Sequence, residues 1–547
     1  VLKLYHTAPE VLQETGRVQD LLDLLGDPIA AVVAAAVAAV CELVPASPNG
    51  TVLVQAVMAQ SQTLLNALSE CSEWGQISLL EGISLVFKDK QAAANMALSE
   101  AETVVDRISP FLQSNNPAVV LSAVNIVVNF LQAFCSSRAS KLTPLQQAEL
   151  EKRYSARIAG PLVSLTSSLR FEMRYVALRT IRVITQRDRD HLVPHVKAFL
   201  VKFDDPIYIK LEKVDVMVSL CNRTNAELVV AELAEYANEV DVELARKAVR
   251  SLGVVAVKNS SIAAQCVERL VALIETRVSY IVQEAAVVVQ QVLRQYPATY
   301  ESIIVKLCRA LDVLDDPESK AAVVWVVGEY ADRIENVAEL MDIFFEAFND
   351  ECLAVQLAVL TAAVKTFLTP SIPQPRRQGV LERALALATA SPVPDLRDRA
   401  CFYWRLVLAD PEAAARVVRA EKEKIVDSGS FDRGLLQELL RDLGRLSAVL
   451  HRPIASAVGD GKRRALHQDD DDEDADDDDA AAAAARARAA KALEEGTDAS
   501  ATADASGAVD FSPAGPSGAT NYLAHSAAPA AGPSPAAATA GSSNLDY

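Results

Sequence analysis

Residues 315–367 decide the fold of this chain, and they read DDPESKAAVVWVVGEYADRIENVAELMDIFFEAFNDECLAVQLAVLTAAVKTF. Asp316-Pro317 predicts a helix start, because an Asp side chain can accept hydrogen bonds from free backbone N–H groups and Pro fits the first turn. Apolar residues then recur at helical spacing, at Val323, Val324, Val327, Tyr330 and Ile334. A second unit opens at Asn349-Asp350 and continues with Leu353, Leu357, Leu360, Val364 and Phe367. The stretch therefore predicts two turn-plus-helix units in succession.

The same design recurs between Pro28 and Leu450. Predicted helix starts lie at Pro28, Glu73, Pro117, Glu172, Pro206, Asp241, Ser279, Pro317, Cys352 and Pro394. From Glu172 onward the starts are 34 to 42 residues apart, the period of paired-helix repeats of the HEAT/armadillo type. The earlier steps are 44 to 55 residues and predict longer loops, the last over residues 136–143. Second helices are expected over Ala264–Thr276 and Tyr300–Leu311.

A single helix pair cannot bury its apolar face, whereas stacked pairs can. No Asn-Gly or Asp-Gly hairpin joins two alternating runs, so strands are not expected. The predicted class is all-α, a right-handed α-solenoid of HEAT/armadillo-like helical pairs. It is followed by an acidic tail rich in Ala, Pro and Ser.

The composition excludes several classes of function. The formal net charge is −19, and residues 460–547 hold 6 basic and 17 acidic residues, which leaves −8 for residues 1–459. An acidic body argues against general nucleic-acid binding, which needs a cationic surface. The longest apolar run, Ile29–Cys41, is about 13 residues, short of the roughly 20 that a spanning helix needs. We therefore expect a protein that binds no nucleic acid and is not transmembrane.

Neither the cysteines nor the histidines form a chemical motif. The eight cysteines are spread singly and are interpreted as small buried hydrophobic residues in a reduced compartment. His191 and His195 are four residues apart, but no Glu of an HExxH motif lies between them and Pro194 interrupts the helix. There is also no phosphate-binding glycine loop and no Ser/His/Asp signature. We expect no enzyme, no cofactor and no metal.

Two groups of side chains allow a structural and a binding interpretation. Trp74, Trp325 and Trp404 come early in their helices and are expected to be core anchors between neighbouring units, with ligand stacking as the alternative. Lys202, Lys210 and Lys213 are expected on a solvated helix face, with contact to an anionic lipid or an acidic partner as the alternative.

The composition changes after Leu450. Lys462-Arg463-Arg464 is a short basic patch, and residues 469–479 hold ten acidic residues out of eleven. Residues 480–493 are rich in Ala, and residues 494–547 contain few apolar side chains. Such a segment cannot bury enough surface to offset the entropy of ordering. We expect a solenoid over residues 1–453 and a disordered, hinge-like tail over residues 454–547.

The run from Trp325 to Asn336, WVVGEYADRIEN, resembles the core signature of β-adaptins, the large β subunits of heterotetrameric clathrin adaptor complexes. Other stretches agree in the same order: residues 73–76, 119–124, 175–179, 205–208, 235–242, 246–250, 300–304 and 394–406. The resemblance covers residues 1–453. It is greater to the β subunits of the trans-Golgi/endosomal and plasma-membrane complexes than to other adaptor or coatomer subunits.

The resemblance implies a trunk scaffold without catalytic activity. The implied partners are a second large adaptin of γ or α type, medium μ and small σ adaptins, and clathrin. An Arf-type GTPase and anionic lipid headgroups are implied through the complex. The implied role is cargo sorting, clathrin coat assembly and vesicle-mediated intracellular protein transport, including endocytosis. The implied location is cytoplasmic, on the cytosolic face of the trans-Golgi network, endosome or plasma membrane.

The family signature falls on Trp74, Pro206, Tyr208, Trp325, Gly328, Glu329, Tyr330, Arg397 and Trp404, for which mainly structural roles are expected. From the resemblance we expect that the chain starts several helices inside the family trunk, without much of the surface attributed to GTPase and phosphoinositide contact, and that it lacks the family's appendage domain.

The family's clathrin box, Leu-Leu-Asn-Leu-Asp, is represented by Asn544-Leu545-Asp546, since Ser542 and Ser543 replace the leading leucines. Residues 21–25 also look like a box, but they are expected in a helix core. The alternative to the adaptin interpretation is another HEAT-repeat scaffold, such as a nuclear transport receptor or a phosphatase scaffold subunit.

Overall fold

The computed structural model describes residues 2–7, 17–45, 47, 50–135, 143–297, 299–423, 425, 431–453 and 456. Every regular element within these ranges is a helix, which confirms the predicted all-α solenoid class. Internal contacts divide the chain into one unit over Val1–Lys462 and another over Arg463–Tyr547. The described residues all belong to the first unit. The predicted tail lies outside them, so its boundary and its disorder stay predictions.

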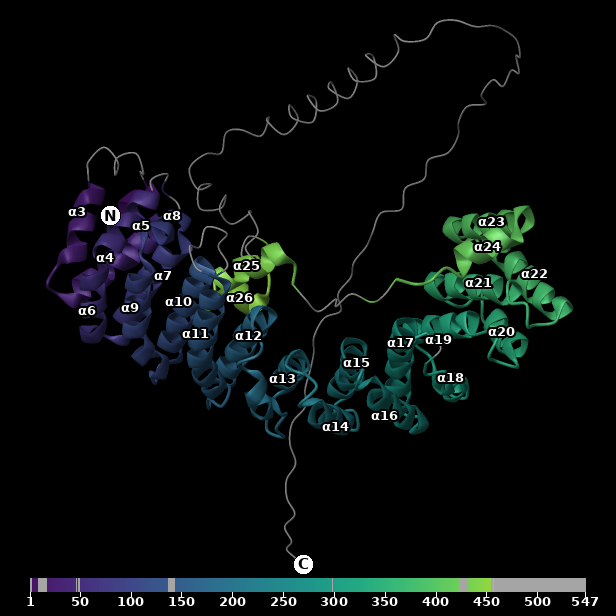
Figure 1. Cartoon of the computed structure of the whole chain (residues 1–547). Coiled ribbons are helices and arrows are strands. Elements are labelled where there is room, and N and C mark those ends of the chain that lie inside the picture. Colours follow the sequence, from purple (N-terminus) through teal and green to yellow (C-terminus); the bar gives the residue numbers. More distant parts are fainter. Residues whose placement is uncertain are drawn as a thin grey trace, which may run out of the picture. The chain divides into compact units, whose positions relative to one another are not determined.

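Within the described ranges, ten helices that we call row A follow one another along the first unit (Figure 1). They are α4 (Ala30–Leu43), α7 (Glu73–Lys88), α10 (Pro117–Cys135), α12 (Phe171–Arg187), α13 (Ile207–Ser219), α15 (Val242–Lys258), α17 (Ser279–Gln295), α19 (Pro317–Glu329), α21 (Leu353–Phe367) and α23 (Pro394–Ala409). Each begins within two residues of a start predicted from the sequence. Consecutive row A helices pack closely on each other, whereas α10 and α12 make few direct contacts, one of them a 3.5 Å hydrogen bond from Arg187 to the carbonyl of Val128.

A second set of helices, row B, completes the repeats. Row B consists of α6 (Ser61–Glu70), α9 (Leu98–Ile108), α11 (Pro144–Leu165), α14 (Ala226–Tyr236), α16 (Ala263–Glu275), α18 (Ser302–Cys308), α20 (Val337–Glu346) and α22 (Gln374–Ala390). The helices α16 and α18 confirm the two predicted second helices. The shorter elements are α1 (Leu2–Thr7), α3 (Arg17–Asp23), η1 (Leu24–Gly26), α5 (Gly50–Ala59), α8 (Lys90–Asn95), η2 (Ser109–Gln113), η3 (Val193–Phe199), η4 (Leu311–Val313), α24 (Pro411–Val418), α25 (Arg433–Arg441) and α26 (Leu446–Leu450).

The structure corrects two details of the repeat prediction. The stretch 315–367 contains three helices rather than two, because α20 lies between α19 and α21. The long early steps arise in part from the additional helices α5 and α8 and from the 22 residues of α11. The predicted loop at residues 136–142 lies outside the described residues.

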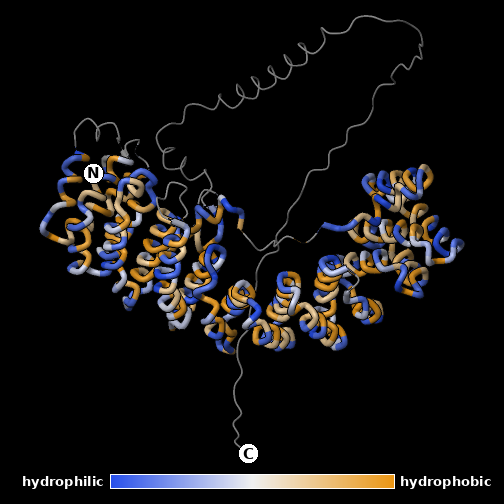
Figure 2. The backbone as a smooth tube through the Cα atoms, in the orientation of Figure 1, coloured by the Kyte–Doolittle hydropathy of each residue, from blue (hydrophilic) through white to orange (hydrophobic). Residues whose placement is uncertain are grey.

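The start of α19 shows how the sequence produces these helices. Asp316 is the N-cap, and its carboxylate accepts a hydrogen bond from the backbone N–H of Ser319 at 3.3 Å. Pro317 occupies the first turn, as expected. The apolar stripe through Val323, Val324 and Val327 is fully buried. Hydrophobic residues recur in this way along every helix of the stack (Figure 2).

Small residues let the row A helices approach closely. A Cβ atom added to Gly82 would lie 2.3 Å from Cγ1 of Val37, and one added to Gly253 would lie 2.6 Å from Cγ1 of Val288. At Gly328 the added atom would lie 2.7 Å from the Cα of Ala362. These crossings exclude any larger side chain without displacement of the neighbouring helix.

The helix α10 is the longest apolar helix among the described residues and the one long and apolar enough to cross a membrane. Its most apolar window is 67% buried inside the stack. Asn125 and Asn129 are buried on it, and both side-chain amides reach the hydroxyl of Ser84 on α7, at 3.4 and 3.2 Å. We interpret α10 as a core helix of the solenoid.

Not all the cysteines are buried, which was the prediction for all eight. Cys221 and Cys266 are buried, whereas Cys352 and Cys401 are exposed. Cys352 is the N-cap of α21 and Cys401 lies on α23. The prediction therefore holds in full only at Cys221 and Cys266, holds in part at four half-buried cysteines, and fails at Cys352 and Cys401 near the C-terminal end of the stack.

Gly328→Val should force α19 and α21 apart, because the new side chain would overlap the backbone of Ala362. We expect a loss of about 1–3 kcal/mol in the free energy of unfolding, read as a lower thermal unfolding midpoint by circular dichroism. The control is Gly160→Ala in α11, where no atom lies within 4 Å of the added Cβ. A Gly328→Val midpoint equal to wild type would contradict the close crossing.

Candidate docking surfaces

The exposed face of row A carries ion pairs that join one helix to the next. Arg179 of α12 pairs with Glu212 of α13 at 2.8 Å, and Arg182 pairs with Asp215 at 2.8 Å. Lys247 of α15 reaches back to Asp215 at 2.6 Å. Partners of this kind are about one repeat apart in the sequence. We call these ion pairs between successive row A helices the ladder, and they depend on the regular stacking of those helices.

Two lysines suggested for lipid or acidic-partner contact belong instead to the stack. Lys213 is buried and pairs with Asp205 at 2.5 Å, while Arg174 of α12 pairs with the same carboxylate at 3.1 Å. Burial lowers the pKa of Lys213, and the hydrogen bond to Asp205 opposes that shift. Lys210 pairs with Asp241 at 3.2 Å. Of the proposed set, only Lys202 is exposed.

The expectation that all three tryptophans anchor the core is wrong for two of them. Trp74 is 83% exposed in the first turn of α7, and Trp404 is 51% exposed on α23. Trp325 is half-buried and packs against the core. Helical spacing identified the helices correctly but not which of these aromatic rings face solvent.

The signature residues after Trp325 lie at the crossing of α19 and α21. Gly328 permits the close approach, and the hydroxyl of Tyr330 donates to the carbonyl of Leu293 at 3.3 Å. Glu329 accepts a hydrogen bond from Lys365 at 2.7 Å, and the Lys365 ammonium also lies 5.3 Å from the Trp325 ring centroid. Burial lowers the pKa of Lys365. These residues hold two repeats together.

The remaining signature residues have local roles. Pro206 is the N-cap of α13, and the Tyr208 ring meets Tyr175 of α12 edge-on at 5.7 Å. Arg397 is exposed and donates to the carbonyl of Ser391 at 3.2 Å. These contacts are structural. The predicted clathrin contact at Asn544, Leu545 and Asp546 lies outside the described residues.

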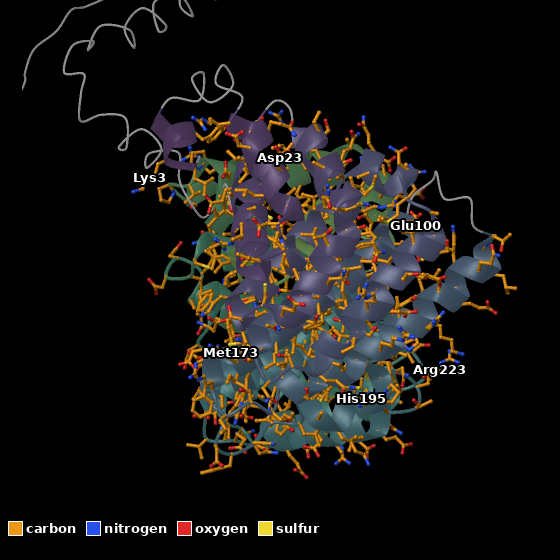
Figure 3. The ribbon with its side chains drawn as sticks, turned by 90° about the vertical axis from the view of Figure 1, so that its left-hand side faces the viewer. Lys3, Asp23, Glu100, Met173, His195 and Arg223 are labelled. Atoms are coloured by element: carbon orange, nitrogen blue, oxygen red, sulfur yellow. The ribbon has the colours of Figure 1, made fainter. Side chains whose placement is uncertain are left out.

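The histidine pair and the box-like leucines have ordinary surroundings. His195 is exposed on η3 (Figure 3), and His191 lies 3.9 Å from the Asp188 carboxylate. Over the described ranges, no three His, Cys, Asp or Glu side chains gather as metal ligands. Leu21 and Leu25 are buried, which confirms the expected core position for these two leucines, whereas Leu24 of the same stretch is exposed.

An open groove crosses α19, α21 and α23 near the C-terminal end of the stack. It has a volume of about 1000 Å³, and its lining includes Trp325, Leu357, Lys365, Phe402 and Tyr403. Residues 420–423 form one wall. The groove combines aromatic surface with charged groups of both signs, as expected of a surface that takes a polypeptide rather than a small substrate.

The last repeat continues this surface beyond the groove. Phe402, Trp404 and Leu408 on α23 are exposed, as is Val417 on α24, and Leu408 is 71% exposed. Trp404 and Leu408 are four residues apart on one side of α23, and we call them the terminal face. Phe402 lies on another side of that helix and, with Val417, lines the groove. A solenoid normally closes its end with polar residues, and exposed apolar patches on soluble proteins mark interaction sites. The terminal face is therefore a candidate docking surface.

The segment after α24, residues 419–453, turns back along row A, and we call its described part the C-terminal strap. Lys422 lies 3.8 Å from Glu329, and the carbonyl of Glu423 accepts a hydrogen bond from Arg294 at 3.0 Å. Further along, α25 packs against both α10 and α12, and α26 packs against α12. The strap fills the space between α10 and α12, which make few direct contacts with each other. Sequence reasoning missed it.

Ion pairs and backbone contacts fix the strap in place. Arg445 pairs with Glu81 of α7, and Lys88 pairs with Asp442 at 3.4 Å. Leu439 on α25 and Leu443 in the turn after it are buried. The strap is thus part of the core. The amphipathic pattern of Arg433–Arg441 could have predicted this helix. That pattern alone does not identify the helices against which its apolar side packs.

His451 closes the strap in a left-handed backbone conformation, with φ of 54°. Its Nε2 lies 3.1 Å from the carbonyl oxygen of Arg179, and the Phe431 ring packs on its imidazole. Burial lowers the pKa of His451 to about 4, and the nearby Arg179 acts in the same direction. The imidazole is therefore neutral at pH 7 and donates to the carbonyl.

These surfaces belong to a helical-repeat scaffold, and sequence comparison identifies the family of that scaffold. Residues 1–411 match the model of the adaptin N-terminal region, and the chain belongs to the adaptin family. It is 42% identical over 471 residues to AP-1 complex subunit beta-1 of mouse and of human, which is 86% of this chain and 47% of each relative. The AP-1 complex subunit beta of Dictyostelium discoideum is 40% identical over 457 residues, 83% of this chain and 46% of the relative.

The chain thus spans about half the length of the curated relatives it matches. Among solved structures, a homology model of the full-length AP-3 complex gives a TM-score of 0.46 at 14% identity, covering 75% of this chain and 89% of that one. A complex of Kap95p with RanGDP gives 0.45 at 13% identity, covering 82% and 63%. Family membership rests on the sequence matches.

Acidification should loosen the strap through His451. Its pKa is about 4 in the folded chain and about 6.5 in the open strap, so the stabilisation is complete above pH 6.5 and is lost as the pH falls toward 4. We expect amide-exchange protection of residues 446–453 to fall by up to about tenfold per pH unit across this window. His451→Asn, which tolerates the positive φ, should lose this dependence. An identical pH dependence in both proteins would contradict the assignment.

Proposed function

We propose that this chain is the trunk scaffold of a β-type large subunit in a heterotetrameric clathrin adaptor complex. Its adaptin membership and its likeness to AP-1 β subunits support this proposal. The structural observation that carries it is the terminal face with the adjoining groove, where apolar side chains remain exposed at the end of a well-packed stack. The alternative of a nuclear transport receptor or a phosphatase scaffold lacks such sequence support.

The proposed mechanism is recognition without catalysis. A second large adaptin of γ or α type and the μ and σ chains would bury the terminal face and the groove, since Trp404 and Leu408 on the former and Phe402 in the latter supply the aromatic and aliphatic anchors typical of interface centres. Through that assembly the chain would act in cargo sorting and coat assembly at the cytosolic face of Golgi, endosomal or plasma membranes. Clathrin contact at Asn544-Leu545-Asp546, and Arf-type GTPase and lipid contact through the complex, belong to the same proposal.

The direct test is co-expression of the full chain with the γ-type large, μ and σ adaptins of the same organism. We expect a stoichiometric complex by size-exclusion chromatography. The double variant Phe402→Ser/Leu408→Ser should reduce recovery of the partners by at least about tenfold, because two anchors each contribute on the order of 2 kcal/mol.

The matched control is Ile343→Ser, which removes an exposed apolar side chain from the row B helix α20. It should assemble as wild type does. If the wild-type chain is soluble and folded but none of these adaptins is recovered with it, the proposal is contradicted. Normal assembly of the double variant would keep the adaptor role but remove the terminal face from the interface.

A further inference from the structure

The row A face over α12, α13, α15 and α17 holds more cations than carboxylates. Three carboxylates are each shared by two cations: Glu212 by Arg179 and Arg182, Asp215 by Arg182 and Lys247, and Glu284 by Arg246 and Arg250. Five cations therefore face three carboxylates. This excess of positive charge stands out because residues 1–459 carry a net charge of −8.

The carboxylates of this set lie deeper than the cations on α15. The Glu284 side chain is 2% exposed, whereas those of Arg246 and Arg250 are 40% and 59% exposed. Nε of Arg246 is buried and has no hydrogen-bond partner among the described residues. Solvent therefore meets mainly guanidinium and ammonium groups on this face.

The C-terminal strap contacts both ends of the same face, at α12 and at α17, through its backbone. The carbonyl of Val449 accepts from Nε of Arg179 on α12 at 2.6 Å, and the carbonyl of Glu423 accepts from Arg294 on α17. Among the described residues, no strap hydrogen bond reaches α13 or α15, which lie between these two contacts. The described part of the strap therefore leaves the α15 cations partly exposed, between two contacts that already hold backbone.

We propose that the row A face centred on Arg246, Lys247 and Arg250 binds an extended, acidic polypeptide segment of a partner protein. The cations lie in two groups, on α12 and on α15, and α13 between them contributes Glu212 and Asp215. Neighbouring helices pack about 8–10 Å apart and an extended chain advances about 3.3 Å per residue, so about six residues can reach from one group to the other. Two groups of cations at this separation fit an elongated anion better than a compact one. This binding does not depend on the adaptor assignment.

The test uses the full chain and a fluorescein-labelled octa-aspartate peptide in an anisotropy titration at low salt. We expect saturable binding that weakens steeply as salt rises, because the contacts are exposed and screened. Arg250→Gln should weaken binding about three- to tenfold, and Lys247→Gln similarly, since each charge contributes on the scale of exposed ion pairs. Arg269→Gln, at an exposed position on the row B helix α16, should bind as wild type does.

A variant that is expected to bind the peptide more tightly provides a test that misfolding cannot imitate, because misfolding would weaken binding. Glu243 is exposed one turn before Lys247 on α15 and repels an acidic peptide. Glu243→Gln should therefore strengthen binding about threefold. Unchanged affinity in both Arg250→Gln and Glu243→Gln overturns the proposal. So does binding of inositol hexakisphosphate or of phosphatidylserine vesicles that outcompetes the peptide and responds to the same variants, since the surface would then serve a compact or membrane-bound anion.

Discussion

The direct packing of each row A helix on the next is the constraint on which the rest of this structure depends. Gly253 against Val288 and Gly328 against Ala362 leave no room for larger side chains, so these helices approach at close range. The regular stacking of the same row brings Arg182, Asp215 and Lys247 into one chain of ion pairs across α12, α13 and α15. Both the ladder and the open cations of α15 follow from the regular advance of the stack.

The one interruption in row A explains the C-terminal strap. The helices α10 and α12 make few direct contacts with each other, and α25 packs against both of them. A segment more than 300 residues downstream of α10 thus completes the core at that position. The chain beyond residue 453 therefore starts beside α12 rather than at the last repeat. In the proposed adaptor role, this would set where the hinge-like tail leaves the trunk.

The repeats could be predicted from sequence because helix starts are local events. Asp316-Pro317 is recognisable from the chemistry of capping, and the apolar spacing after it predicts which residues are buried. The exposure of Trp74 and Trp404 could not be predicted, because spacing within one helix does not say what covers its first turn or the end of the stack. The pairing of Lys213 with Asp205 and the position of α25 against α10 and α12 could not be predicted either, because both depend on contacts between separate elements. The terminal face was hidden for the same reason, since its residues have the composition of a core.

The strap is the central claim that most separates this structure from a simple stack of repeats. Carbodiimide coupling joins a lysine to a carboxylate only when the two groups touch. In the monomeric full chain, mass spectrometry should recover a Lys88–Asp442 cross-link, whose groups lie 3.4 Å apart, together with the Lys320–Glu351 link between repeats at 2.6 Å. Recovery of the repeat link without any link from Asp442 to α7 would contradict the account.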